Sequence, residues 1–330
     1  MKVEVTKEQS LIKNQRNSSL DFLKLFCAFL IVLFHCEPAY SKWTQAIANC
    51  AVPCFFMISG YLIYSEKINE RCIRSIKKTA KILLWSTLFY MPLLIYGIYT
   101  KNTEIQPVGK LLLNFIVFND NPAGVHLWYL SAYIYVLAVV YFLNKNNKLN
   151  ILYYSIPFLW IADMIGGRVG VNTIYLRNFL FEGLPCFGVG MLVRRFNMEK
   201  FVSIELLVIS IVALCAGCIL ESYLYESSHQ TVSTSLLAIP LLLLFLSLPQ
   251  NRFEKIMSHV DINDSLYIYI FHPAVIILFV QINKFLPEVW TNKVYPFVSP
   301  LVVFVSTYVF IIAFRYVWLS SKNKTLEKRV

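Results

Sequence analysis

The 330-residue chain has few charged residues and few histidines. Only 15% of its residues are Asp, Glu, Lys or Arg, whereas 57% are hydrophobic and the mean hydropathy is +0.58. Because soluble domains carry about a quarter charged residues, this composition excludes an ordinary soluble domain. The five histidines and eight cysteines lack the spacing of a zinc site, so we expect no metal.

Apolar stretches dominate the chain and predict an all-α, polytopic membrane bundle of about ten transmembrane helices, since a helix needs about 20 apolar residues to cross a bilayer. The stretches cover residues 20–36, 43–64, 82–99, 127–143, 149–165, 175–193, 201–220, 231–248, 265–285 and 298–319. Residues 108–118 are too few to span, and they predict an interfacial or re-entrant element. We detect no internal repeat and no soluble second domain.

An even number of passes places both termini on one side of the membrane. Most of the Lys and Arg residues between the apolar stretches fall on that same side. Because positive charge collects in cytoplasmic loops, we predict a cytoplasmic tail at 1–19, a transmembrane domain at 20–320 and a cytoplasmic tail at 321–330. The net charge of +11 then reflects topology and contact with anionic lipids, and we expect no nucleic-acid binding.

The first apolar stretch carries three ionisable residues, Asp21, Lys24 and His35. The step from Lys24 to His35 returns to within roughly 20° of the same helix face, about 16 Å further along the axis. A charge at bilayer depth costs about 2.5–3.5 kcal/mol on insertion scales and usually faces a bundle interior or cavity. We therefore expect this helix to line a site. Asp21 can also pair locally with Lys24, and Ser18 with Asp21 matches a capping box.

Four motifs, in order along the chain, resemble the acyltransferase 3 family. They are Arg16, Asp21, Lys24 and His35 in the first helix, VPCFFMISGY at 52–61, HLWYL at 126–130 and SLYIYIFHP at 265–273. The resemblance spans nearly the whole chain. It implies a multi-pass acyltransferase of the bacterial plasma membrane that moves acetyl from cytoplasmic acetyl-CoA onto a cell-envelope glycan or its precursor.

A narrower set of segments resembles the membrane portion of vancomycin-resistance serine racemases. The segments are FFMISGY at 55–61, IKKTAKILL at 76–84 and MPLLIY at 91–96. In those proteins a soluble racemase domain follows, and the membrane part is associated with serine uptake. Residues 1–330 contain no such soluble domain, so racemase activity is not carried over. Transport of a small amino acid such as serine is the alternative function.

Three lysines are the predicted contacts of the coenzyme. The family usually has arginine where this chain has Lys24, and it has an Arg-x-x-Arg pair that we align with Lys78 and Lys81. Lysine keeps the charge but loses the bidentate fork of arginine. A literal pair at Arg71 and Arg74 lies further upstream. These cations can attract the coenzyme phosphates, although a cytoplasmic stop against anionic lipid explains them equally.

His35 is the predicted catalytic residue. A neutral imidazole can accept a proton from a sugar hydroxyl, or be acylated and pass the group on. The charge bias places His35 at the outer end of the first helix, where an envelope acceptor can reach it. The alternative is a helix cap, because the dipole favours an imidazolium at that end.

Four further residues are predicted to contact the acceptor: His126, Trp128, Arg177 and His272. His126 and Trp128 begin the fourth helix on the outer side, where an aromatic belt alone explains the Trp. Arg177 either recognises the acceptor or pairs with Glu182. His272 precedes a proline, which frees a backbone carbonyl one turn earlier, so its imidazole either satisfies local groups or lines the cavity.

The Ser59–Gly60 pair lacks the flanking glycines of a nucleophile elbow, which makes a serine-hydrolase interpretation poor. Small residues at such positions let two helices approach closely. We therefore predict a packing role for this pair.

Overall fold

The computed structural model describes residues 16–100, 106–225 and 232–327, which form helices and no strand. The first half contains α2 (Ser18–Cys36), α3 (Ser41–Ala48), α4 (Ala51–Ile63), α5 (Ile68–Tyr99), α6 (Val108–Phe118), η1 (Val125–Leu127), α7 (Trp128–Lys145) and α8 (Leu149–Arg168). The second half contains α9 (Thr173–Leu176), η2 (Phe179–Gly183), α10 (Leu184–Phe196), η3 (Met198–Lys200), α11 (Ile204–Tyr225), α12 (Val232–Ser247), α13 (Asn251–Met257), α14 (Asp264–Asn283), η4 (Trp290–Val294) and α15 (Tyr295–Glu327). Most of the predicted N-terminal tail and the end of the C-terminal tail lie outside the described residues.

Eight helices in the described ranges are long and apolar enough to cross a membrane. The pair α12 and α13, bent by 98°, gives a ninth if it counts as one span. These helices confirm the prediction of an all-α, polytopic membrane bundle. The orientation of the termini stays a prediction.

The sixth predicted stretch, 175–193, is not one regular helix. The side chain of Asn178 accepts backbone N–H groups from Leu180 at 2.8 Å and Phe181 at 3.2 Å. These bonds cap a new helix after α9, which begins with the π-helical η2 and continues directly as α10. A hydropathy pattern does not detect such a break, because the few polar residues at 177–182 lie within an otherwise apolar stretch.

Helix α5 begins well before the apolar stretch that predicted it. Its first turns hold the basic segment, because Lys and Arg are good helix formers and extend the helix beyond the apolar part. The short predicted element at 108–118 is confirmed as a helix, α6.

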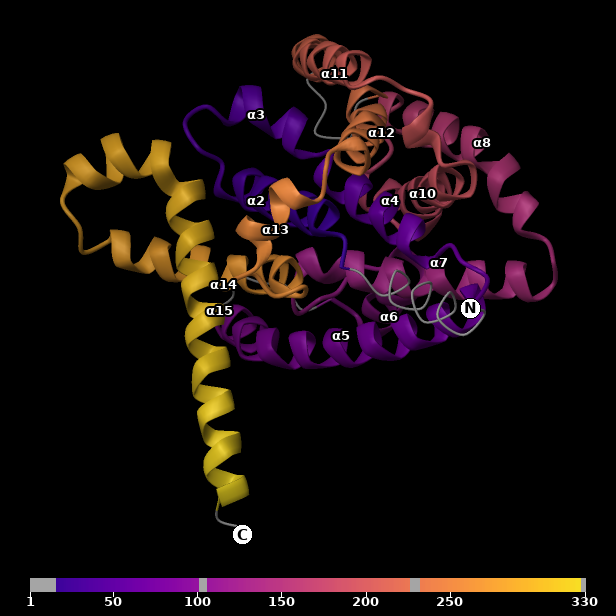
Figure 1. Cartoon of the computed structure of the whole chain (residues 1–330). Coiled ribbons are helices and arrows are strands. Elements are labelled where there is room, and N and C mark those ends of the chain that lie inside the picture. The colour runs from indigo at the N-terminus through magenta and orange to yellow at the C-terminus, as the bar shows by residue number, and fades with distance from the viewer. Residues whose placement is uncertain (1–15, 101–105, 226–231, 328–330) are drawn as a thin grey trace.

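Helix α2 lies in the middle of the bundle, with α5 along one side and α11 and α12 on the other (Figure 1). It packs against α3, α4, α12, α13, α14 and α15, and its Asp21 is buried. The long α15 runs along the edge of the bundle, and its C-terminal end extends beyond it (Figure 1). An ion pair between Arg315 and the buried Asp264 fastens α15 to the start of α14.

Helices α4 and α10 touch backbone to backbone. A Cβ atom on Gly60 would overlap the carbonyl oxygen of Phe187, and one on Gly190 would overlap that of Met57. The two glycines therefore allow an approach that no other residue permits, as small residues do in membrane helix pairs. This confirms the predicted packing role of Gly60.

Candidate functional site

The start of α2 is fixed by Asn17, whose side chain accepts the backbone N–H of Leu20 at 3.0 Å. The predicted capping role of Ser18 is therefore wrong, because Ser18 is already the first helical residue. Asp21 instead forms ion pairs with Arg16 at 2.6 Å and with Lys24 at 2.9 Å. The predicted local pair between Asp21 and Lys24 is confirmed, and it neutralises part of the charge at this end of the helix.

A cavity of about 420 Å³ opens beside this end of α2, between α4, α5, α7 and the start of α14. We call it the basic cavity, because four of its lining residues are positively charged: Lys24, Arg71, Arg74 and Lys78. Lys81, which was predicted with Lys78, does not line it. The volume falls within the range of about 300–1,000 Å³ that small-molecule sites occupy.

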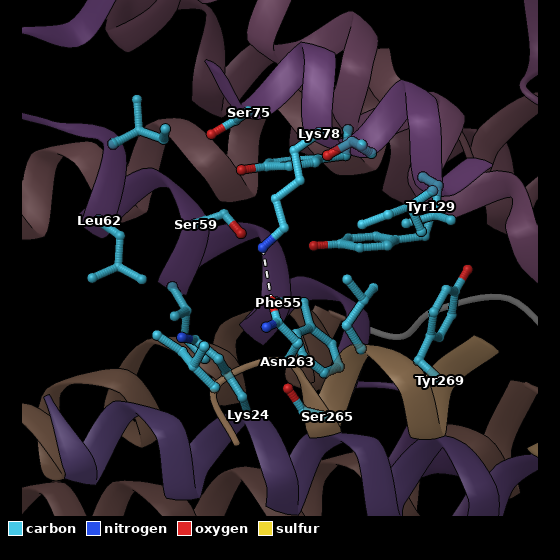
Figure 2. Close-up of a pocket in the computed structure, with 18 of the residues that line it drawn as sticks. Lys24, Phe55, Ser59, Leu62, Ser75, Lys78, Tyr129, Asn263, Ser265 and Tyr269 are labelled. Atoms are coloured by element: carbon cyan, nitrogen blue, oxygen red, sulfur yellow. Dashed lines mark hydrogen bonds between the residues drawn. The ribbon is translucent and has the colours of Figure 1, made fainter. Parts of the chain in front are cut away.

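The side chain of Lys78 reaches across the basic cavity from α5 and donates a hydrogen bond to Asn263 at 2.7 Å (Figure 2). Arg71 donates to the carbonyl oxygen of Leu62 at 2.5 Å. Arg71, Arg74 and Lys78 are all exposed. This part of the cavity therefore presents accessible, hydrated cations to an incoming ligand.

Other walls of the same cavity are aromatic and weakly polar. Phe55, Tyr129 and Tyr269 line it, together with the hydroxyl of Ser59 (Figure 2). A ligand that fits this cavity would combine an anionic group with a long, less polar segment.

A second cavity, of about 130 Å³, lies at the opposite end of α2. We call it the histidine cavity. His35, in the last turn of α2, is exposed and lines it, together with the predicted acceptor residues His126, Trp128 and Arg177. Four residues from three separate parts of the chain, predicted as site residues from the sequence, thus meet in one place.

His272 lies behind this cavity and lines neither one. Its ring centroid is 5.1 Å from that of His35 and 5.9 Å from that of His126. Its Nδ1 lies 3.1 Å from the carbonyl oxygen of Ile268 and 2.9 Å from that of Tyr269. Since both partners are acceptors, Nδ1 carries the proton and donates. Nε2 is left as a buried acceptor that has no partner among the described residues.

The Tyr269 carbonyl is the group that Pro273 leaves without its helical partner. His272 therefore satisfies local groups, which was the alternative role, whereas its predicted place in the cavity lining is not found. The three histidine rings lie together, but within the described ranges they do not form a cluster that could hold a metal ion.

Three side chains line both cavities: Ile31, Val52 and Tyr269. We call them the dividing layer. Tyr269 is buried, and its hydroxyl donates to the carbonyl oxygen of His126. The two cavities are therefore back to back, and a group that leaves one for the other has to pass this layer.

Arg177 lies between α9 and η2, with its guanidinium 5.2 Å from the ring centre of Trp128. The predicted alternative, an ion pair between Arg177 and Glu182, stays a prediction. Glu182 also lines the histidine cavity and is buried.

Sequence reasoning did not single out Tyr269 and Asn263. Tyr269 precedes His272 by three residues in one of the quoted motifs, so its position on nearly the same helix face was a usable signal. Asn263 lies in a polar connection before α14, and no pattern marks it as the partner of a lysine on a distant helix.

Comparison with known proteins supports both resemblances predicted from the motifs. Residues 17–317 match the family described as acyltransferase domain. A serine/alanine racemase of Enterococcus gallinarum is 26% identical over 349 residues, which cover 95% of this chain and 48% of that protein. An amino-acid racemase of Enterococcus faecalis is 31% identical over 165 residues, with coverage of 47% and 22%.

A second amino-acid racemase of Enterococcus faecalis is 26% identical over 308 residues, with coverage of 82% and 43%. The chain thus spans less than half the length of these curated relatives. No solved structure matches it. The family match covers nearly all the described helices, and the chain therefore belongs to the acyltransferase domain family, as a multi-pass membrane protein.

Proposed function

We propose that this protein transfers an acetyl group from acetyl-CoA in the basic cavity to a hydroxyl of a cell-envelope saccharide, or its precursor, at the histidine cavity. One observation carries the proposal: two cavities of different chemistry meet at the dividing layer in a member of an acyltransferase family. We place the protein in the bacterial plasma membrane, with the basic cavity facing the cytoplasm because of the distribution of positive charge.

The basic cavity suits the donor. Coenzyme A carries phosphates on one end and a long, weakly polar arm on the other. Lys24, Lys78 and the two arginines would bind the phosphates through charge-assisted hydrogen bonds, and Lys78 would exchange the Asn263 amide for a phosphate oxygen. The aromatic part of the cavity would then receive the arm that carries the thioester. Lys81 lies outside the lining, so it would act only through the positive electrostatic potential that it adds near the basic cavity.

His35 suits the proton transfer. In a direct reaction the acceptor oxygen bonds to the acyl carbon, the carbon–sulfur bond breaks, and the hydroxyl proton passes to the imidazole of His35. The thiolate leaves with the bonding electrons and is then protonated. In a two-step reaction a nitrogen of His35 takes the acyl group first and the acceptor oxygen displaces it. Both versions yield a free thiol and an acylated acceptor.

His272 would act as a positioning residue. Its Nδ1–H is held by two backbone carbonyls, so its ring is fixed behind His35, and its Nε2 is a buried acceptor. A fixed neighbour restricts the orientation of the catalytic imidazole, which is the usual role of groups behind a reactive side chain.

A second candidate function is transport of a small amino acid such as serine. The observation that favours it is the similarity to proteins named serine/alanine and amino-acid racemases. In that case the two cavities would be the two faces of a substrate path, and His35 would contact the substrate without bond breaking.

The test uses radiolabelled acetyl-CoA and the purified protein in nanodiscs. We expect acetyl transfer or slow hydrolysis, with a loss of about 100-fold or more in His35→Ala, the lower range for a general base. His259→Ala is the matched control, because His259 is an exposed histidine outside both cavities. Equal turnover in His35→Ala would overturn the assigned role. Uptake of labelled serine into proteoliposomes without any dependence on coenzyme A would favour transport.

A further inference from the structure

We propose that Val52 sets the longest acyl group that this protein transfers, because its side chain limits the space where the two cavities meet. This inference rests on the proposed function and deepens it, since it assigns the choice of acyl group to one residue of the dividing layer. The substrate class that it concerns is the coenzyme A thioesters of short, saturated acyl groups.

The position of His35 places the reacting acyl carbon at the dividing layer. Ile31, which lines both cavities, precedes His35 by four residues on α2. Residues four apart lie on the same face of a helix, with their Cβ atoms about 5–6 Å apart. The imidazole therefore lies one turn beyond the layer, on the side of the acceptor. A thioester that arrives through the basic cavity has to bring its carbonyl carbon as far as the layer to meet an oxygen activated by His35.

The carbon chain of a longer acyl group has little room on either side of the layer. Ahead of it lies the histidine cavity, with a volume of about 130 Å³ against about 420 Å³ for the basic cavity. The acceptor has to occupy this smaller cavity at the same time. Behind the layer, the arm of the coenzyme would fill the aromatic part of the basic cavity. The walls of the layer therefore decide how long a chain can be accommodated.

Two of the three side chains in the layer are fixed by packing. Ile31 and Tyr269 are both buried and belong to the main hydrophobic core. The hydroxyl of Tyr269 donates to the carbonyl oxygen of His126, and its ring centre lies 5.7 Å from that of Tyr129. Because protein cores are close-packed, neither side chain can make room for extra methylene groups without the loss of existing contacts.

Val52 is the third wall and the one that is not fully packed. It is half-buried and is the second residue of α4. A valine in a helix has one strongly preferred χ1 rotamer, so its two methyl groups hold one position. Helix α4 itself cannot move aside, because its backbone already touches that of α10. The size of the side chain at position 52 therefore sets the width of the layer.

The chemistry of the layer favours selection by size. Ile31 and Val52 are aliphatic, and the Tyr269 hydroxyl is already bonded to the His126 carbonyl. These three side chains thus offer an acyl group no free polar partner. One methylene group more or less in an apolar pocket changes specificity by about 10–200-fold, so the loss of two methyl groups from Val52 is large enough to measure.

The experiment compares acetyl-CoA, propionyl-CoA and butyryl-CoA, each with a labelled acyl group, as donors for the full chain in nanodiscs. We expect the natural protein to have a kcat/KM for acetyl-CoA about tenfold or more above that for butyryl-CoA. In Val52→Ala the ratio of butyryl to acetyl turnover should rise about tenfold. In Val52→Ile, which adds a methylene group to the wall, the ratio of propionyl to acetyl turnover should fall.

Val140→Ala is the matched control. Val140 is a buried valine on α7 and lines neither cavity. Its substitution removes the same two methyl groups, so it reports any general loosening of the bundle, and we expect the chain-length ratios to stay as they are. Equal use of butyryl-CoA and acetyl-CoA by the natural protein would overturn the inference. A shift of the same size in Val140→Ala would also overturn it.

Turnover and binding together separate failure of this inference from failure of the proposed function. Acetyl transfer that depends on His35, with an unchanged chain-length ratio in Val52→Ala, overturns the inference and leaves the proposed function standing. If no thioester is turned over, the proposed function fails, and equilibrium binding of the three thioesters tests Val52. Tighter binding of butyryl-CoA relative to acetyl-CoA in Val52→Ala supports the inference. An unchanged ratio of affinities, or no binding of any thioester, overturns it.

Discussion

The basic cavity and the histidine cavity differ in how they hold their charges. The cations of the basic cavity are mostly exposed ends of long side chains on α5, and one of them is already paired with an amide across the opening. The histidine cavity has one cation with a buried, unpartnered nitrogen and two imidazole rings in its lining, with the fully buried ring of His272 in contact range behind them. Exposed charges attract a ligand from a distance but orient it loosely, whereas fixed and buried groups orient it closely. We therefore expect changes in the first cavity to alter binding and changes in the second to alter chemistry.

Helix α4 lines both cavities, so the largest effect should come from displacing it from its partner α10. Gly190→Ala would force α10 away from the backbone of α4. We expect a loss of stability of about 3 kcal/mol or more, above the usual cost of overpacking, and loss of activity from both cavities together. Thermal unfolding followed by tryptophan fluorescence measures it.

Gly109→Ala provides the control for this substitution, since a Cβ atom there meets nothing within 4 Å. It should leave the unfolding temperature nearly unchanged. If Gly190→Ala were equally harmless, the close contact between α4 and α10 would not be what holds the two cavities in place.

The next effect should be confined to the basic cavity. Lys78→Met removes one hydrogen-bonding cation from the lining, and we expect acetyl-CoA to bind about tenfold more weakly, with the deficit shrinking at high salt. Lys81→Met removes the same charge one turn further along α5 but outside the lining, so its effect should be smaller. Equilibrium binding measures the affinity of both variants for acetyl-CoA. Equal losses of affinity would mean that the overall positive potential of α5, and not contacts inside the cavity, binds the coenzyme.

The smallest effect should come from the dividing layer. Tyr269→Ala removes the largest side chain shared by both cavities, and we expect water to reach the thioester. Hydrolysis of acetyl-CoA without acceptor should then rise a few-fold while transfer to acceptor falls. Tyr269→Phe keeps the ring and loses only the hydrogen bond to the His126 carbonyl, so it should behave nearly like the natural protein. Unchanged hydrolysis in the alanine variant would contradict the assigned role of this layer.

The sequence predicted the helical bundle and much of the histidine cavity because those signals are local. The polar residues of the first helix stand out against apolar neighbours, and the effect of Pro273 on the carbonyl one turn earlier follows from covalent structure. The conversion of residues 175–193 into α9, η2 and α10 depends on how the Asn178 side chain turns, which hydropathy does not encode. From the sequence, Lys78 and Lys81 were both predicted to contact the coenzyme, because they are cations on similar faces of α5. In the structure Lys78 lines the basic cavity and contacts Asn263 from a distant segment, whereas Lys81 does not line the cavity.

In the proposed reaction an acyl group passes from the basic cavity to the histidine cavity. The most direct test is a preparation of proteoliposomes with the protein in one orientation and acetyl-labelled acetyl-CoA supplied only on the face with Arg71, Arg74 and Lys78. We expect free thiol to accumulate on that face, labelled acetate or acetylated acceptor to appear on the other, and His35→Ala to stop both. Acetyl-CoA that stays intact while labelled serine crosses the membrane unchanged would contradict acyl transfer and establish a transporter.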